Sequence, residues 1–170
     1  MHVERRSPED FNTLPVTPVT IRPFDPASKQ AALAYGKRLN DLLAATGVSA
    51  ELFGSVELEI AGKGEWEFAL YPSDVQWYPT LIVLINQYRS VYTISDEFVL
   101  FEDVCDGHPI EVIVMRGGTA ERNQAIMRYW REHPAARASY EEQKYRHCHV
   151  KRDYYRWKEH FIADILDSLS

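Results

Sequence analysis

The sequence has few of the residues that build disulfide-bonded or zinc-stabilised domains. Only two cysteines occur in 170 residues, Cys105 and Cys148, and their spacing matches neither a zinc site nor a disulfide framework. No apolar run approaches the roughly 20 residues that span a bilayer, and no internal repeat or low-complexity segment is present. We therefore expect both thiols to be reduced and the protein to be cytoplasmic, without a membrane partner.

Positive charge is also scarce, but it is unevenly placed. The net charge of -6 argues against broad, nonspecific nucleic-acid binding. From Arg116 to His160, eleven Lys and Arg stand against six Asp and Glu, a balance of +5, so the remainder carries -11. Two interpretations stay open: the basic part faces an anionic ligand held over the acidic part, or its helices carry solvated surface charge.

The length and the 45% content of hydrophobic residues suit one domain with a single sizeable core. Residues 1–18 contain three prolines and no periodicity, which predicts a flexible N-terminal tail. Residues 19–170 are expected to form the domain, with a sheet part at about 19–116 and a helical part at about 117–170.

Hydrophobic periodicity predicts an α/β (α+β) fold, in which a sheet is backed by helices and followed by a C-terminal helical bundle. Asp25-Pro26 and Ser73-Asp74 are helix starts, and Asp106-Gly107 is a hairpin turn. The expected strands are residues 50–55, 65–70, 91–94, 97–104 and 109–115. In the helix predicted for residues 73–89, the expected core face consists of Val75, Tyr78, Leu81, Ile82, Ile85 and Tyr88.

One stretch combines a Gly-Ser pair with two carboxylates. Nine residues separate Ser55 of Phe53-Gly54-Ser55 from Glu65, and Glu65 and Glu67 alternate with Trp66 and Phe68. Because side chains alternate across a strand, both carboxylates are expected on one face. Two acids on a rigid strand can share Mg²⁺ or Mn²⁺ together with the phosphates of a nucleotide. The alternative is an ordinary surface strand whose solvent-exposed face carries glutamates.

Glu111 lies in an otherwise apolar run of β-branched residues, Ile110 to Val114. An unpaired carboxylate is costly to bury, so its presence needs a reason. Either Glu111 is a third metal ligand beside Glu65 and Glu67, or it faces water on an edge strand.

The spacing from Gly54-Ser55 to Glu65 resembles the nucleotidyltransferase motif of the polymerase-beta-like superfamily. A second resemblance, to the GrpB family, covers about residues 19–168. It is carried by the phrases at residues 21–26, 130–134, 140–144 and 154–162. The GrpB family belongs to the nucleotidyltransferase-like superfamily, so both resemblances imply a nucleotidyltransferase-like mixed sheet.

The resemblance also implies a function and a set of site residues. It implies a nucleotidyltransferase that uses Mg²⁺ or Mn²⁺ to transfer a nucleoside monophosphate from a nucleoside triphosphate to an unknown acceptor. The implied residues are the metal-holding and catalytic Glu65, Glu67 and Glu111, and the phosphate-binding Gly54, Ser55, Lys63, Arg131, Lys144 and Lys158.

Departures from the family pattern leave other functions open. The family usually carries Asp and His where this chain has glutamates, and aligning Lys63 on the family lysine would put Ala69 at the second acidic position. The alternatives are a non-catalytic nucleotide- or anion-binding protein with a degenerate acidic site, and a protein-interaction module that uses exposed aromatics such as Tyr145, Tyr155 or Trp77.

Overall fold

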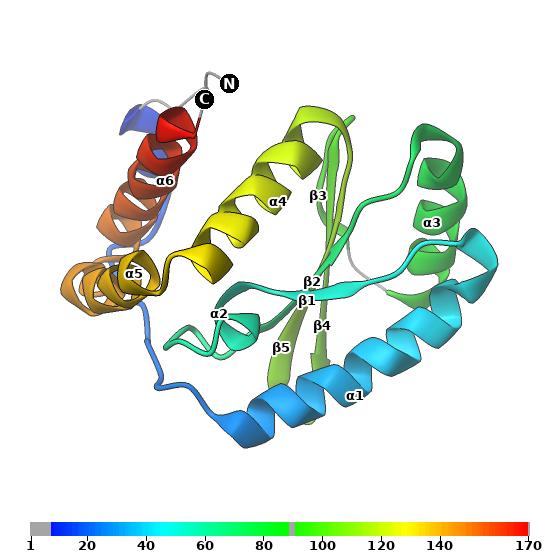
Figure 1. Ribbon diagram of the computed structural model, residues 1–170, viewed down its shortest axis with the longest axis horizontal. Coiled ribbons are helices and arrows are strands. Elements are labelled where there is room, and N and C mark those ends of the chain that lie inside the picture. The colour runs from blue at the N-terminus through cyan, green and yellow to red at the C-terminus, as the bar shows by residue number, and fades with distance from the viewer. Residues whose placement is uncertain (1–7, 89–90, 170) are drawn as a thin grey trace.

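The computed structural model describes residues 8–88 and 91–169 of the chain. A five-stranded mixed sheet lies at its centre, in the order β1-β2-β5-β4-β3 (Figure 1). Strands β2 and β5 are parallel neighbours, and the other pairs are antiparallel. The strands are β1 (Glu51–Phe53), β2 (Trp66–Leu70), β3 (Val91–Ile94), β4 (Phe98–Cys105) and β5 (His108–Met115).

Helices cover both faces of this sheet. Figure 1 shows α1 and α3 on one side and α4 on the other, with α5 and α6 beyond α4. The α-helices are α1 (Pro26–Leu43), α2 (Gly54–Glu57), α3 (Asp74–Gln87), α4 (Gly117–Glu132), α5 (Pro134–His147) and α6 (Lys151–Ser168), and the 3-10 helices are η1 (Pro8–Phe11) and η2 (Ala44–Thr46). The predicted class, a mixed sheet backed by helices with a C-terminal helical bundle, is confirmed. No helix in the described ranges is long and apolar enough to cross a membrane.

The helix-capping and turn residues predicted from the sequence have the expected hydrogen bonds and backbone angles. The Asp25 carboxylate accepts a hydrogen bond from the Ala27 backbone N–H at the start of α1. Ser73 and Gln76 form a reciprocal capping box at the start of α3. Asp106 and Gly107 both have positive φ, 52° and 80°, as a tight two-residue hairpin requires.

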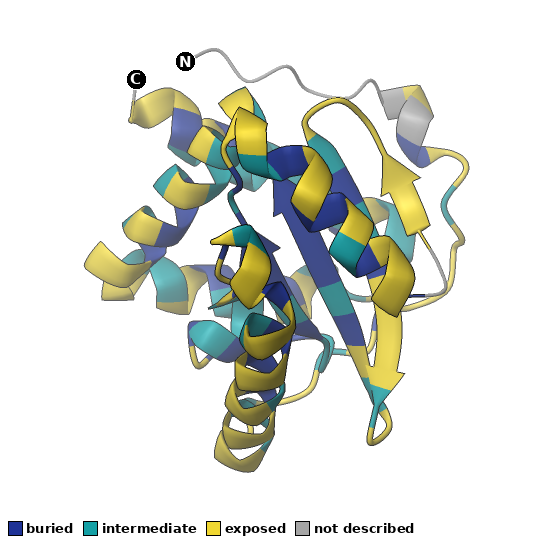
Figure 2. Cartoon of the chain, turned by 90° about the vertical axis from the view of Figure 1, so that its right-hand side faces the viewer, coloured by how far each residue is buried: buried dark blue, intermediate teal, exposed yellow. Residues whose placement is uncertain are grey.

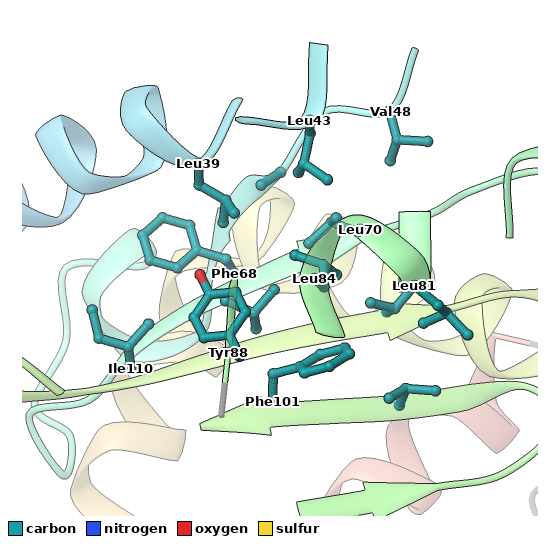
Figure 3. Packing of buried hydrophobic residues seen from close by; sticks show 14 of the residues in the cluster. Leu39, Leu43, Val48, Phe68, Leu70, Leu81, Leu84, Tyr88, Phe101 and Ile110 are labelled. Carbon is teal, nitrogen blue, oxygen red and sulfur yellow. The ribbon is translucent and has the colours of Figure 1, made fainter. Parts of the chain in front are cut away.

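The main core lies between the sheet and the two helices α1 and α3. The alternating side chains of β2 place Trp66, Phe68 and Leu70 on this face, where each is at most 1% exposed. Figure 3 shows Phe68 and Leu70 among side chains from α1, α3 and β4. Full burial of a side chain such as Phe68 contributes about 2 to 3 kcal/mol to stability.

The other face of the sheet is apolar at one end and acidic at the other. Ala69, Ile113 and Met115 form a small buried cluster that α4 covers with Ala120. Figure 2 shows buried residues along the central strands, whereas β3, the second half of β4 and the outer sides of the helices are mostly exposed. Glu67 and Glu111 lie on the same face as Ala69 and Ile113, because they are two residues away along the same strands.

Helix α3 turns a different face to the core from the one predicted. Trp77, Thr80, Leu81 and Leu84 are buried, whereas Val75, Tyr78, Ile82 and Ile85 are between 54% and 85% exposed. The prediction is confirmed for Leu81 and Tyr88, which are 7% and 4% exposed, and wrong for the other four residues. Because α3 is apolar on nearly every side, periodicity alone did not show which face packs. The same finding makes Trp77 a core residue, not an exposed aromatic.

The first strand is shorter than predicted. It ends at Phe53, and Gly54 and Ser55 begin the one-turn helix α2. Gly54 takes φ of +72°, a conformation that glycine adopts without steric cost and that breaks the strand at this point. The Gly-Ser pair is therefore positioned by a helical turn and not by a strand.

Residues 8–18 belong to the stretch for which the sequence predicts a flexible tail, yet they lie against the C-terminal helices. Phe11 is fully buried. The Val19 N–H donates to the Cys148 carbonyl, and the Lys151 N–H donates to the Thr17 carbonyl, both at 2.7 Å. These contacts tie this part of the chain to the junction between α5 and α6, and residues 1–7 lie outside the described residues.

Candidate functional site

Three glutamates predicted from the sequence come together at two neighbouring strands, two of them within the strands and one just before β2. Glu67 of β2 lies directly opposite Glu111 of β5 in the parallel register, and Glu65 immediately precedes β2. Their carboxylates each offer an oxygen, and these three oxygens lie within 4.8 Å of one another. Because β5 lies between β2 and β4 in the sheet, the alternative that Glu111 faces water on an edge strand is wrong.

The glutamate group raises the pKa of one of its own members. The pKa of Glu111 is raised to about 7, first by partial burial and then by the negative charges of Glu67 and Glu65. Lys63 and Lys158 act in the opposite direction and only partly offset this shift. The raised pKa shows that the neighbouring carboxylates disfavour one another's negative charge. A divalent cation bound among them would relieve this repulsion.

The arrangement of oxygens fits such an ion. Mg²⁺ binds carboxylate oxygens at about 2.0 to 2.1 Å, so oxygens on opposite sides of it lie about 4 Å apart. A separation of at most 4.8 Å is close to that value, and half-buried side chains can close the difference by small rotations. Glu65, Glu67 and Glu111 are the residues that could hold a metal.

Lys63 lies against the first of these acids. Its amine is 2.7 Å from Glu65 Oε2 and donates a hydrogen bond of 3.2 Å to the Tyr155 hydroxyl. Burial alone would lower the pKa of Lys63, but the Glu65 carboxylate outweighs burial and raises it. Lys63 therefore stays charged and supplies a cation at the rim of the acidic group.

Lys158 brings a second cation to the site from α6. Its pKa is raised by the phenol of Tyr140 first and also by Glu67 and the phenols of Tyr154 and Tyr155, although burial acts against the charge. Glu67 and these tyrosines thus keep the amine in its charged form. Lys158 and Tyr155 also line a cleft between the sheet, α4 and α6, whose walls include Phe53, Phe98 and Met115.

Gly54 is required by the close approach of Glu67. A β-carbon at position 54 would overlap the Glu67 carboxylate, and the positive φ already favours glycine. Gly54 therefore acts on the site by leaving room for an acidic side chain. The next residue, Ser55, accepts a hydrogen bond of 2.7 Å from the Lys144 amine through its hydroxyl.

Lys144 is buried beneath the site and does not face it as an open cation. The side chain is 1% exposed, and its amine also donates to the Ala61 carbonyl at 2.7 Å. On the same helix, Glu141 accepts a 2.6 Å hydrogen bond from the Ala61 N–H. Both backbone groups of Ala61 are thus hydrogen-bonded to side chains of α5. Burial first, and then the charge of Lys158, lower the pKa of Lys144 to about 7.

Arg131 is placed apart from the other predicted basic residues. Its guanidinium donates a 3.0 Å hydrogen bond to Glu57 of α2, and its side chain is about half exposed. It lines a small pocket with Glu51 and Tyr71 beside β1. The described contacts of Arg131 thus join α4 to α2 and not to the glutamate group.

Three tyrosines around Lys158 and the half-buried Glu141 were not predicted as site residues. Tyr140 and Tyr154 each precede a lysine of the site, Lys144 and Lys158, by four residues. Residues four apart share a helix face, so this spacing was a signal that could have found both tyrosines. No comparable signal marked Glu141, whose partner is a backbone N–H 80 residues away.

No family model matches the sequence, and no curated protein matches it. Among solved structures, the chain is similar to a cytoplasmic RNA terminal U-transferase, with a TM-score of 0.42 and 12% sequence identity. The similar region covers 65% of this chain and 33% of the other, so the chain spans about a third of the length of that structure.

Proposed function

We propose that this chain is a metal-dependent nucleotidyltransferase of the GrpB type, which transfers a nucleoside monophosphate from a nucleoside triphosphate to an acceptor. One observation carries the proposal: the carboxylates of Glu67 on β2 and Glu111 on β5 meet the carboxylate of Glu65, which immediately precedes β2. Rigid strands hold such groups in a fixed geometry, which is what a preorganised cation site needs.

Each residue of the site has a part in this proposal. Glu65, Glu67 and Glu111 would hold Mg²⁺ or Mn²⁺, which neutralises phosphate charge and polarises the α-phosphorus when bound. The charges of Lys63 and Lys158 both act on Glu111, and both lysines have a raised pKa that keeps them charged. They are therefore suited to bind the phosphate oxygens of the nucleotide as point charges.

The proposed transfer forms one bond at the α-phosphorus and breaks another. An acceptor oxygen forms a bond to the α-phosphorus, the bond from that phosphorus to the bridging oxygen of the β-phosphate breaks, and pyrophosphate leaves. The proton of the acceptor passes to a carboxylate of the glutamate group and then to water. The protein contributes by positioning the phosphates and by offsetting their charge.

A second candidate, a non-catalytic anion-binding protein, is favoured by one specific contact. Lys63 is already paired with Glu65 at 2.7 Å, so part of the negative charge of the group is balanced within the chain. In such a protein the lysines bind an anion and the glutamates only orient the lysines.

Calorimetry with a non-hydrolysable nucleoside triphosphate separates these two functions. For the transferase, we expect binding that requires Mg²⁺ and weakens at least about tenfold in Glu67→Gln. Glu121→Gln is the matched control, because Glu121 is exposed on α4. Binding that is unchanged by Mg²⁺ and by Glu67→Gln would instead support the anion-binding protein, and absence of binding would remove support from both.

A further inference from the structure

The connection between α2 and β2 is held near its end by side chains from α5. The Lys144 amine donates to the Ala61 carbonyl at 2.7 Å, and the Glu141 carboxylate accepts from the Ala61 N–H at 2.6 Å. Ala61 is fully buried, so both of its backbone groups need a partner inside the protein. Residues three apart lie on one face of a helix, and this pair of side chains fixes the place and the orientation of the Ala61 backbone.

The Lys144 amine also holds the beginning of the connection. Its hydrogen bond to the Ser55 hydroxyl is 2.7 Å long, and the Ile60 N–H donates to the Ser55 carbonyl at 3.1 Å. Ser55 and Gly62 lie in close contact, because a β-carbon at Gly62 would overlap the Ser55 side chain. Residues 55–62 therefore form a closed loop, and one amine of α5 is bonded to both of its ends.

Lys63 follows this loop directly. Its amine lies 2.7 Å from Glu65 Oε2, at the rim of the glutamate group. An antiparallel bridge between Gly62 and Arg22 gives the loop backbone support, but Ala61, two residues before Lys63, is bonded to side chains of α5. The position of the loop against α5 therefore decides where the Lys63 side chain enters the site.

We propose that Glu141 and Lys144 are positioning residues, which hold Ala61 so that Lys63 stays against Glu65. Neither side chain needs to touch a ligand in this role, since both act through the loop at residues 55–62. The placement of Lys63 is a property of the protein alone. Its consequence, a cation placed to bind phosphate, rests on the function proposed above.

Acetylation with acetic anhydride, followed by mass spectrometry, tests the placement without any ligand, because it reports how accessible each lysine amine is. Glu141→Ala removes the acceptor of the Ala61 N–H. We expect the Lys63 amine to react about three- to tenfold faster in this variant, which is the shift in a local equilibrium that the loss of one hydrogen bond of ordinary strength gives. Glu141→Gln keeps an acceptor oxygen and should restore the rate of wild type.

Glu142→Ala is the matched control, because it removes the neighbouring carboxylate, which is exposed and pairs with Arg146 on the same helix. The exposed Lys37 of α1 is the reference lysine in every variant. A Lys63 rate in Glu141→Ala that is unchanged, or that rises no more than the rate of Lys37, overturns the proposal. Acceleration in Glu141→Gln as well would assign the effect to the charge and would also overturn it.

Lys144→Met acts on the other backbone group of Ala61 and is the second variant. It removes the hydrogen bond to the Ala61 carbonyl and leaves the Glu141 carboxylate in place, so Lys63 should again react faster while Lys37 does not. A folded Lys144→Met protein in which Lys63 keeps the rate of wild type contradicts a positioning role for Lys144.

Nucleotide binding connects the placement to the proposed function. With Mg²⁺, binding of the non-hydrolysable nucleoside triphosphate should weaken about three- to tenfold in Glu141→Ala, but Glu141→Ala should have no further effect in a chain that already carries Lys63→Met. An equal loss in both backgrounds would show that Glu141 does not act through Lys63 and overturns the proposal. If wild type binds no nucleotide, the proposed function fails, whereas a faster Lys63 in Glu141→Ala still supports the placement.

Discussion

Replacing Lys144 with methionine should change how stability depends on pH. In the folded chain the pKa of Lys144 is lowered to about 7, from an ordinary value of 10.5, first because the amine is buried and next because Lys158 repels it. Glu67 and Glu141 only partly offset these effects. Methionine has a similar length and no charge, so Lys144→Met removes the titration with little change in volume.

The direction in which the free energy of unfolding changes with pH depends on whether the folded or the unfolded chain holds the Lys144 proton. Between pH 7 and 10.5 the unfolded chain keeps Lys144 protonated while the folded chain has released the proton, so the free energy of unfolding rises with pH. Each pKa unit is worth about 1.4 kcal/mol, so wild type should gain about 3 kcal/mol over Lys144→Met between about pH 7 and pH 9.5. The gain levels off above the ordinary pKa and vanishes below the folded one.

Urea denaturation of wild type and Lys144→Met, followed across this range, measures the gain directly. The lost hydrogen bonds to Ser55 and Ala61 shift the variant by a roughly constant amount, whereas the titration gives the slope. Lys37→Met is the matched control, because it makes the same replacement at an exposed position of α1. Parallel profiles for wild type and Lys144→Met, or a difference that shrinks as pH rises, would refute the reasoning.

Two further predictions concern the glutamate group. Gly54→Ala should lower the free energy of unfolding by about 2 kcal/mol, since the added carbon overlaps the Glu67 carboxylate and the positive φ is strained for alanine, as urea denaturation can measure; an unchanged stability would contradict the close packing. Glu67→Gln should lower the pKa of Glu111 from about 7 by about one unit, because it removes a neighbouring negative charge. A carbon-13 titration of the Glu111 carboxyl measures this shift, and an unmoved pKa would mean that burial alone raises it.

Local signals predicted the parts of the fold that depend on neighbouring residues. The caps at Asp25 and Ser73 and the Asp106-Gly107 turn were visible because their hydrogen bonds and positive φ angles are made within a few residues. Alternation along residues 65–70 placed Glu65 and Glu67 on the side of the sheet away from Trp66, Phe68 and Leu70, as the structure has them.

Features that depend on distant partners could not be predicted in the same way. Glu111 was left between two interpretations because only the strand order places β5 beside β2. Lys144 looked like an open cation because its partners Ser55 and Ala61 lie more than 80 residues away. The outward face of α3 was taken for its core face because both faces are apolar, and only the packing against α1 and the sheet distinguishes them.

The most direct test of the proposed metal site is a titration with Mn²⁺ monitored by electron paramagnetic resonance, which reports the free ion. Wild type should remove about one Mn²⁺ per chain from solution, and added nucleoside triphosphate should increase the affinity. In the double variant Glu65→Gln/Glu67→Gln, the affinity should fall at least about tenfold. Equal Mn²⁺ binding by wild type and the double variant would contradict a metal site at Glu65, Glu67 and Glu111.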